Sequence, residues 1–173
     1  EGLIAFSNRH YYDNELLTFP SPHTERGATG GVRFVHLPDA RYDKGDTRTN
    51  PKEARALVAE LVQRLRTPGE RRSFGVVTFS QAQQDLIENL LDEERRKHHD
   101  IEPHFGDAPP VEGEPVFVKS LESVQGDERD VILFSIGYGV DETGSVSMNF
   151  GPLNREGGER RLNVAITRAK HEI

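Results

Sequence analysis

The sequence predicts an α/β protein with a parallel β-sheet and helices on both faces, and three features support this. Strand-like and helix-like segments alternate along the chain from Val32 onward. Residues 74–79 form a short, nearly continuous apolar run, as expected for a strand covered on both faces. Residues 131–136 form the strongest strand signal in the chain. Such alternation is typical of βαβ units, whose strands lie parallel.

A first amphipathic helix is predicted between residue 50 and the stop signal Thr-Pro-Gly at residues 67–69. Asn50 can cap this helix, Pro51 suits its first turn, and Glu53 stands at the capping-box position. Apolar residues then recur at helical spacing, and they are Ala54, Leu57, Val58, Leu61, Val62 and Leu65.

A second helix is predicted directly after the strand at residues 74–79. Ser80 can cap it, with Gln83 at the capping-box position. Its apolar residues are Leu86, Ile87, Leu90 and Leu91. The charged tail at residues 93–100 includes His98 and His99, which we interpret as surface residues, so we predict no metal site.

Shorter segments complete the expected order. We expect a helix at residues 3–12 and strands at residues 16–19, 32–37 and 115–118. Loops are expected at residues 27–31, 40–50, 101–114 and 137–151, where Gly, Pro and polar residues gather, and the last of them could form a small hairpin.

Composition limits the classes of protein that the chain can belong to. Its 173 residues suit one domain, and the absence of Cys excludes a disulfide framework and favours a reducing, cytoplasmic location. No apolar run is long enough to cross a membrane. The net charge of −7 restricts any nucleic-acid contact to a local patch. Because the chain starts with Glu1 rather than Met, we expect a fragment of a longer protein.

Residues 158–170 are predicted to form a helix with an apolar stripe and two arginines at its edge. The stripe has the spacing i, i+3, i+4 and i+7 and consists of Leu162, Ala165, Ile166 and Ala169. Arg161 and Arg168 are seven residues apart, so they would stand one above the other. A rigid arginine suits phosphate recognition, since its planar guanidinium donates two hydrogen bonds at once. The same pattern also fits a surface helix with solvated arginines.

Two sequence strings resemble motifs of one known family. Gly-Glu-Arg-Arg-Leu-Asn-Val-Ala-Ile-Thr-Arg-Ala-Lys at residues 158–170 resembles motif VI of superfamily 1 helicases, in the subgroup that includes the nonsense-mediated-decay helicase. Ser-Val-Gln-Gly-Asp-Glu-Arg-Asp-Val-Ile-Leu at residues 123–133 resembles motif V. The motifs occur in the family's order, and the resemblance covers nearly the whole chain. It implies that residues 1–173 are a single RecA-like domain of P-loop NTPase type, the second of the two in such a motor.

The resemblance places ATP in a cleft between two RecA-like domains. This chain contains no Gly-x-x-x-x-Gly-Lys-Ser/Thr string, so it lacks the phosphate loop itself. The loop and the acidic pair that holds Mg²⁺ would lie on the N-terminal RecA-like domain of the same parent chain. We therefore expect ATP and Mg²⁺ to bind the full-length parent, and neither to bind this fragment tightly.

The resemblance also assigns roles to particular residues. Arg168 matches the arginine finger of motif VI, and Arg161 is a second catalytic candidate, which could instead form a salt bridge to Glu159 or Asp130. For the nucleotide, Glu128 matches the acid that accepts a hydrogen bond from the ribose, and Gly126 fits a place of close backbone approach.

Three further residues are candidates for contacts with single-stranded DNA or RNA. Ser123 and Gln125 match motif V positions at the nucleic-acid backbone, and Thr78 matches motif IV. Hydroxyl and amide groups at strand ends can hold phosphates without selecting a sequence. Each of these residues could also be a simple cap or turn residue.

Two functions therefore stay open from the sequence. The first is the second motor domain of an ATP-dependent helicase or translocase, inactive as an isolated fragment. The second is a degenerate RecA-like module that binds nucleic acid or a protein without ATP turnover. A small-molecule enzyme is disfavoured, because no Gly-x-Gly-x-x-Gly string and no nucleophile–base pair is evident.

Overall fold

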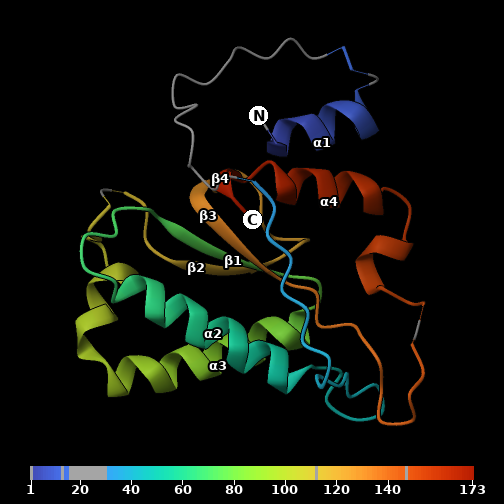
Figure 1. Cartoon of the computed structure of the whole chain (residues 1–173), viewed down its shortest axis with the longest axis horizontal. Helices are drawn as coiled ribbons and strands as arrows, with labels where there is room; N and C mark the ends of the chain where they lie inside the picture. The colour runs from blue at the N-terminus through green and yellow to red at the C-terminus, as the bar shows by residue number, and fades with distance from the viewer. Residues whose placement is uncertain (1, 13, 16–30, 112, 147) are drawn as a thin grey trace.

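The structure is a computed structural model, shown in Figure 1. It describes residues 2–12, 14–15, 31–111, 113–146 and 148–173. Within these residues, four strands form one parallel sheet in the spatial order β2-β1-β3-β4. The strands are β1 (Phe74–Thr78), β2 (Phe117–Ser120), β3 (Arg129–Ser135) and β4 (Ala169–Glu172). The predicted parallel sheet is confirmed.

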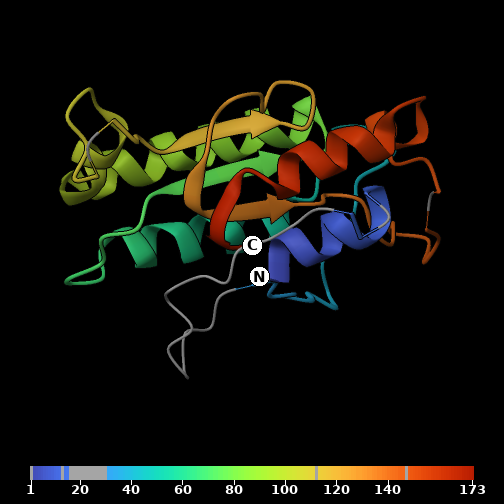
Figure 2. The ribbon, with the colours of Figure 1, turned by 90° about the horizontal axis from the view of Figure 1, so that it is seen from above.

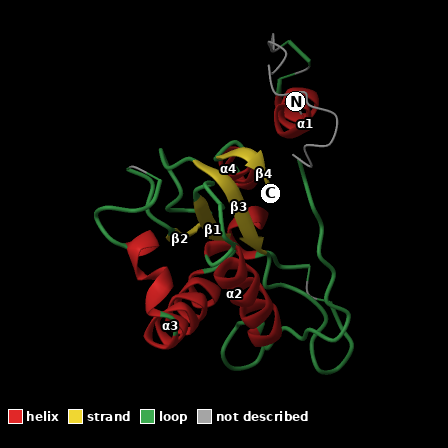
Figure 3. Ribbon diagram, turned by 60° about the vertical axis from the view of Figure 1, so that its left-hand side comes forward, coloured by secondary structure: helices red, strands yellow, loops and turns green. Residues whose placement is uncertain are grey.

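Helices cover both faces of the sheet, as the sequence predicts. The long helices α2 (Pro51–Leu65) and α3 (Gln81–Lys97) lie together on one face (Figure 3). The short helix α4 (Gly158–Ile166) covers the opposite face, and α1 (Gly2–Tyr11) packs beyond α4 (Figures 1 and 2). Among the described residues, no helix combines the length and apolar character needed to cross a membrane.

Strand β1 occupies the centre of the sheet and is buried along its whole length. Successive side chains face opposite layers, so Val76 packs in the core of α2 and α3 while Val77 packs in the core under α4. Gly75 leaves room for Phe117 of β2, since an added Cβ would lie 2.5 Å from Cζ of that ring. The continuous apolar pattern of residues 74–79 follows from this double burial.

Both predicted helix caps are confirmed, but neither forms a reciprocal capping box. Asn50 Oδ1 accepts from the N–H of Glu53 at 3.2 Å, and Ser80 Oγ accepts from the N–H of Gln83 at 3.3 Å. The Glu53 carboxylate instead accepts from Ser135 Oγ at 2.8 Å, and buried Gln83 donates to the same hydroxyl at 3.0 Å. These two side chains therefore tie the starts of α2 and α3 to the end of β3.

The helix expected at residues 158–170 is too long, and this prediction is wrong for its last residues. α4 ends at Ile166, and Thr167 is its C-terminal cap. Ala169 begins β4 and pairs with Arg129 of β3. Ala169 is apolar because it is buried in the sheet. The helical spacing of apolar residues cannot distinguish a buried strand residue at this position from a further residue of the helix.

The strand expected at residues 32–37 is also absent from the sheet. Only Gly31 makes a parallel bridge, to Glu172, and the N–H of Arg33 donates to the carbonyl of Ile173 at 2.7 Å. Most side chains of this segment are exposed. Its alternating pattern is not matched by a partner strand within the described residues, and alternation alone does not provide one.

Other boundaries differ by a few residues. The helix predicted at residues 3–12 is confirmed as α1, and residues 137–151 contain an antiparallel bridge between Val140 and Val146, as a small hairpin would. A 3₁₀ helix, η1 (His99–Phe105), interrupts the loop predicted at residues 101–114.

Strand β2 begins two residues later than the prediction of 115–118, at Phe117. Pro115 has no N–H for a sheet ladder, and its carbonyl accepts two hydrogen bonds from Arg129. The strand predicted at residues 16–19 lies outside the described residues, as do residues 27–30.

Glu172 anchors the end of β4 through two arginines. Its carboxylate lies 2.9 Å from Nη2 of Arg64 and 3.0 Å from Nη1 of Arg72. Arg72 also binds Glu70, at 2.9 Å through Nε. The network joins β4, α2 and the segment before β1, and so fixes the strand that directly follows Arg168.

We expect Glu70→Gln to destabilise the domain in a pH-dependent way. Hydrogen bonds from Arg72 lower the pKa of Glu70 from 4.5 to about 2. A lowered folded-state pKa stabilises the fold above the unfolded-state pKa, and this stabilisation is lost as the pH falls through the folded-state value. The deficit in Tm of the Gln variant should therefore be largest at neutral pH and shrink between about pH 4.5 and pH 2. A deficit that does not change with pH would contradict this role of Glu70.

Candidate functional site

Arg168 lies in the tight turn between α4 and β4, at the edge of the sheet where the strands begin. Its N–H donates to the carbonyl of Ala165 at 3.1 Å, which closes the last turn of the helix. Its carbonyl accepts from the N–H of Arg129 at 3.0 Å, which joins it to the start of β3. The backbone on both sides of Arg168 is therefore fixed by a helix end and a strand start.

The Arg168 guanidinium is held on one side and points to a carboxylate on the other. Nε donates to the carbonyl of Val164 at 3.1 Å, and Nη2 donates to the hydroxyl of Thr167 at 3.3 Å. Nη1 lies 3.7 Å from Oε1 of Glu128. The Arg168 side chain is 20% exposed and that of Glu128 is 53% exposed. The arginine of the pair is therefore mostly covered by the domain, whereas the carboxylate is open to solvent.

Glu128 and Gly126 reach this edge through an unusual connection. Residues 121–128 link β2 to β3 and cross the α4 face of the sheet without a helix, with Leu121 and Val124 buried in the core. Gly126 has φ of 83°, a left-handed conformation that favours glycine. An added Cβ would meet no protein atom within 4 Å, so the backbone conformation, and not a close approach to the neighbouring turn, favours glycine here.

Two of the nucleic-acid candidates, Thr78 and Ser123, lie at the opposite edge, where the strands end, and Gln125 directly precedes Gly126 in the connection from β2 to β3. Ser123 follows the end of β2, where its hydroxyl accepts from the N–H of Ser120 at 3.0 Å, and both Ser123 and Gln125 are exposed. Thr78 is fully buried, and its hydroxyl donates to the carbonyl of Ser80 at 3.0 Å. Thr78 thus supports the turn into α3, and its side chain offers no accessible atom to a ligand.

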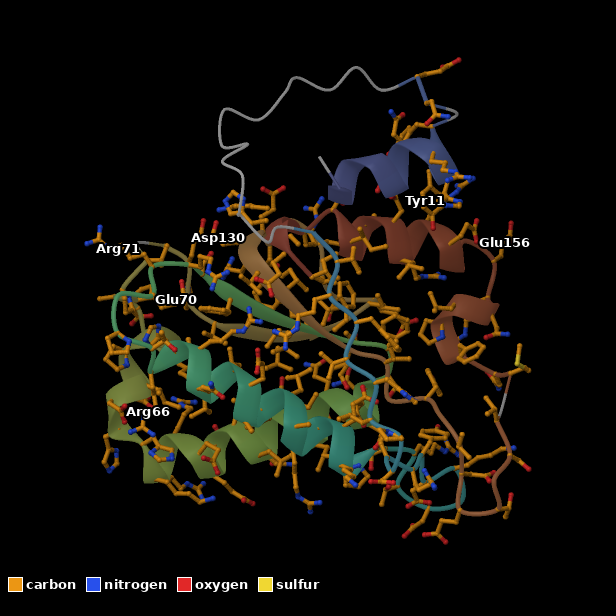
Figure 4. All side chains as sticks on the ribbon, in the orientation of Figure 1. Tyr11, Arg66, Glu70, Arg71, Asp130 and Glu156 are labelled. Atoms are coloured by element: carbon orange, nitrogen blue, oxygen red, sulfur yellow. The ribbon has the colours of Figure 1, made fainter. Side chains whose placement is uncertain are left out.

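Arg161 does not join Arg168. Its Nη1 donates to the carbonyls of Pro152 and Glu156, at 3.4 and 3.2 Å, and neither of the salt bridges expected as alternatives, to Glu159 or to Asp130, is formed. Figure 4 shows Asp130 and Glu156 near opposite ends of α4, which separates the surroundings of Arg168 from those of Arg161. The structure brings Arg168, Glu128 and Gly126 together and leaves Arg161 apart.

A polar depression of about 460 Å³ lies next to the Arg168–Glu128 pair. Its lining residues are Gly113, Glu114, Pro115, Gly126, Asp127, Glu128, Arg129 and Lys170. Lys170 pairs with Glu114 at 2.5 Å, and Lys119 pairs with Asp127 at 2.5 Å. Burial raises the pKa of Glu114, but hydrogen bonds from Lys170 and Ser73 outweigh it and hold that pKa below its ordinary value.

Sequence reasoning missed most of the groups around the Arg168–Glu128 pair and the depression beside it. Thr167 and Lys170 stand inside the motif VI string, but their spacing does not show what they contact. Glu114 lies in a proline-rich segment with no recognisable pattern. Arg129 is buried, with its guanidinium carbon 4.8 Å from the centre of the Phe117 ring, and a lone arginine in a motif does not reveal such a contact.

The parallel sheet with helices on both faces, together with the two motif strings, defines a RecA-like α/β domain of the helicase class. A family model described as an AAA domain matches residues 1–173, the whole chain. The chain belongs to this AAA-domain family, which is found in superfamily 1 helicases.

Curated relatives agree with this assignment. The chain is 40% identical over 180 residues to an uncharacterised ATP-dependent helicase of Mycoplasma genitalium. The aligned region covers 99% of this chain and 14% of that protein. A homologue in Mycoplasma pneumoniae is 39% identical over 175 residues, with the same coverage. The helicase required for RNAi-mediated heterochromatin assembly 1 of Schizosaccharomyces pombe is 31% identical over 147 residues, covering 83% of this chain and 12% of that protein. The chain thus spans about a seventh of the Mycoplasma relatives it matches.

Proposed function

We propose that this chain is the second motor domain of an ATP-dependent DNA or RNA helicase or translocase, and that Arg168 is its arginine finger. The observation that carries the proposal is the orientation of Arg168, whose Nη1 points from a fixed turn to an anionic group, the Glu128 carboxylate. A group held in this way is suited to meet the phosphates of a nucleotide bound by a neighbouring domain.

The chemistry of the proposed finger is electrostatic. Phosphoryl transfer spreads negative charge over the oxygens of the transferred group, and an arginine supplied from outside stabilises that charge. Arginine fingers contribute roughly 10³–10⁵-fold to turnover in the systems where they are known. The guanidinium group of Arg168 suits this role because it is permanently charged and planar.

Glu128 and Gly126 are proposed to hold the nucleoside part of ATP. The Glu128 carboxylate is half-exposed and can accept a hydrogen bond from a ribose hydroxyl. Gly126 supports the backbone turn that brings Glu128 to this edge. Mg²⁺ would neutralise phosphate charge from the other RecA-like domain, because the phosphate loop is missing from this sequence.

We expect the isolated 173-residue chain to show almost no ATPase activity, and the full-length parent to hydrolyse ATP with stimulation by single-stranded nucleic acid. The reason is that half of the phosphate-binding groups would be on the other domain. Steady-state phosphate release from equal concentrations of the two proteins measures this. Strong, nucleic-acid-stimulated hydrolysis by the isolated chain would overturn the proposal.

We also propose that single-stranded DNA or RNA contacts the surface on which Ser123 and Gln125 are exposed. Two cations near this surface are already paired, Lys119 with Asp127 and Arg155 with Glu122 at 3.5 Å. Few phosphates can therefore be neutralised, and binding by the isolated chain should be weak and fall as salt is raised. Fluorescence anisotropy with a labelled oligonucleotide at several salt concentrations measures this. Tight, sequence-specific duplex binding at physiological salt would contradict it.

A second candidate, a binding module without ATP turnover, is favoured by one observation. Arg168 already forms hydrogen bonds through Nε and Nη2 and an ion pair with Glu128 within its own domain, and the net charge of −7 disfavours binding of phosphates. For this candidate, the full-length parent would bind nucleic acid but would not hydrolyse ATP, so the ATPase comparison separates the two.

A further inference from the structure

Thr167 connects the end of α4 to the Arg168 guanidinium. Its hydroxyl donates to the carbonyl of Val164 at 2.8 Å and accepts from Nη2 of Arg168 at 3.3 Å. The same carbonyl accepts from Nε of Arg168 at 3.1 Å. The three groups form a closed set of hydrogen bonds at the helix end.

The direction of each bond in this set is determined by chemistry. A guanidinium only donates and a backbone carbonyl only accepts, so the Thr167 hydroxyl must give its proton to Val164 and offer a lone pair to Arg168. Because the carbonyl of Val164 lies in the last turn of α4, it also carries the partial negative charge of a helix C-terminus. Both features favour a cation held in this place.

This arrangement divides the guanidinium into a held edge and a presented edge. Nε and Nη2 are bound to the domain itself, whereas Nη1 faces Glu128 and the open side of the site. An anion that replaces Glu128 as the partner of Nη1 would meet an arginine whose plane is already fixed. Fixing the plane beforehand removes the need to order a long, flexible side chain when the nucleotide binds.

We propose that Thr167 is a positioning residue for Arg168, acting through its hydroxyl and not by touching the nucleotide. The proposal rests on the proposed function of Arg168 as a finger. It adds a determinant that lies outside the arginine itself, and it predicts that the hydroxyl, rather than the size or the β-branching of the side chain, is what matters.

The test uses four variants of the full-length parent, namely Thr167→Val, Thr167→Ser, Arg168→Ala and the double variant Thr167→Val/Arg168→Ala. Valine keeps the shape of threonine without the hydroxyl, and serine keeps the hydroxyl. We expect Thr167→Val to lower kcat about tenfold, the scale of a modest misplacement of a catalytic group, with ATP affinity and Tm unchanged. Thr167→Ser should retain normal kcat.

The double variant shows whether Thr167 acts through Arg168. If it does, Thr167→Val should cause no further loss of kcat once Arg168 is alanine. An additional loss in that background would overturn the proposal, as would equal losses of kcat in the Val and Ser variants. If Thr167→Val has normal kcat while Arg168→Ala is impaired, the positioning role is wrong and the finger stands. If Arg168→Ala itself is normal, both fail.

Discussion

Arg168→Ala in the full-length parent is expected to lower kcat by roughly 10³–10⁵-fold, the range of known arginine fingers. The fold should survive, because the core under α4 is formed by Ala165, Ala169 and their apolar neighbours rather than by Arg168. ATP should still bind, since the charge acts mainly on the transition state. The measurement combines kcat, nucleotide affinity and a melting curve for each variant.

Two controls make this result specific. Arg168→Lys should rescue kcat only in part, because an ammonium cannot donate through Nε and Nη2 while presenting a third nitrogen. Arg160→Ala removes an exposed arginine from the same helix and should leave kcat unchanged. Normal kcat for Arg168→Ala would show that the finger assignment is wrong. A loss of activity caused only by unfolding would make Arg168 a structural ion-pair partner of Glu128.

Among Gly→Ala substitutions at the start of α4, Gly158→Ala is expected to cause the largest loss of stability. Gly158 is buried, and an added Cβ would lie 2.2 Å from the carbonyl oxygen of Leu153, in the 3₁₀ helix η2 (Gly151–Asn154). A backbone atom cannot move aside as a flexible side chain can. Overpacking of this kind costs about 1–3 kcal/mol.

The stability of Gly158→Ala can be measured by thermal or urea unfolding of the domain. Each kcal/mol lost should lower Tm by roughly 2–4 °C in a domain of this size. The matched control is Gly106→Ala, since an added Cβ at Gly106 meets nothing within 4 Å and φ there is −88°. Equal Tm values for the two variants would mean that η2 and α4 do not pack as closely as the structure shows.

Local signals predicted the elements on which the fold is built. Asn50 and Ser80 marked the starts of α2 and α3, because a capping side chain and its helix are only three residues apart. The apolar run at residues 74–79 marked β1, because burial on both faces leaves no polar position. These features depend on nearby residues and can be found without tertiary information.

Where tertiary contacts decide, the same reasoning failed. Ala169 fits an apolar helical stripe and a buried strand equally well, and only its pairing with Arg129 of β3 distinguishes them. Residues 32–37 alternate as a strand does, but alternation does not provide a partner. Glu53 and Gln83 suited capping boxes, but buried Ser135 gave their side chains other partners.

The candidate site was predicted in part. The motif strings named Arg168 and Glu128, and the structure places these two side chains 3.7 Å apart. The motif VI string also named Arg161, and the resemblance to motif IV named Thr78. Both lie elsewhere and bind backbone carbonyls. A motif identifies residues that share a segment, whereas the groups that orient Arg168, above all Thr167, become visible only with its hydrogen bonds.

The most direct test of the central claim compares two ligands of the full-length parent. ADP represents the bound nucleotide, and ADP with aluminium fluoride mimics the charge of the phosphoryl group during transfer. The affinity of each is measured for the unchanged protein and for Arg168→Ala. If Arg168 is a finger that acts across the cleft, the variant binds ADP normally and loses most of its affinity for the aluminium fluoride complex. Equal affinities of the two proteins for that complex, or an equal loss for both ligands, would contradict the claim.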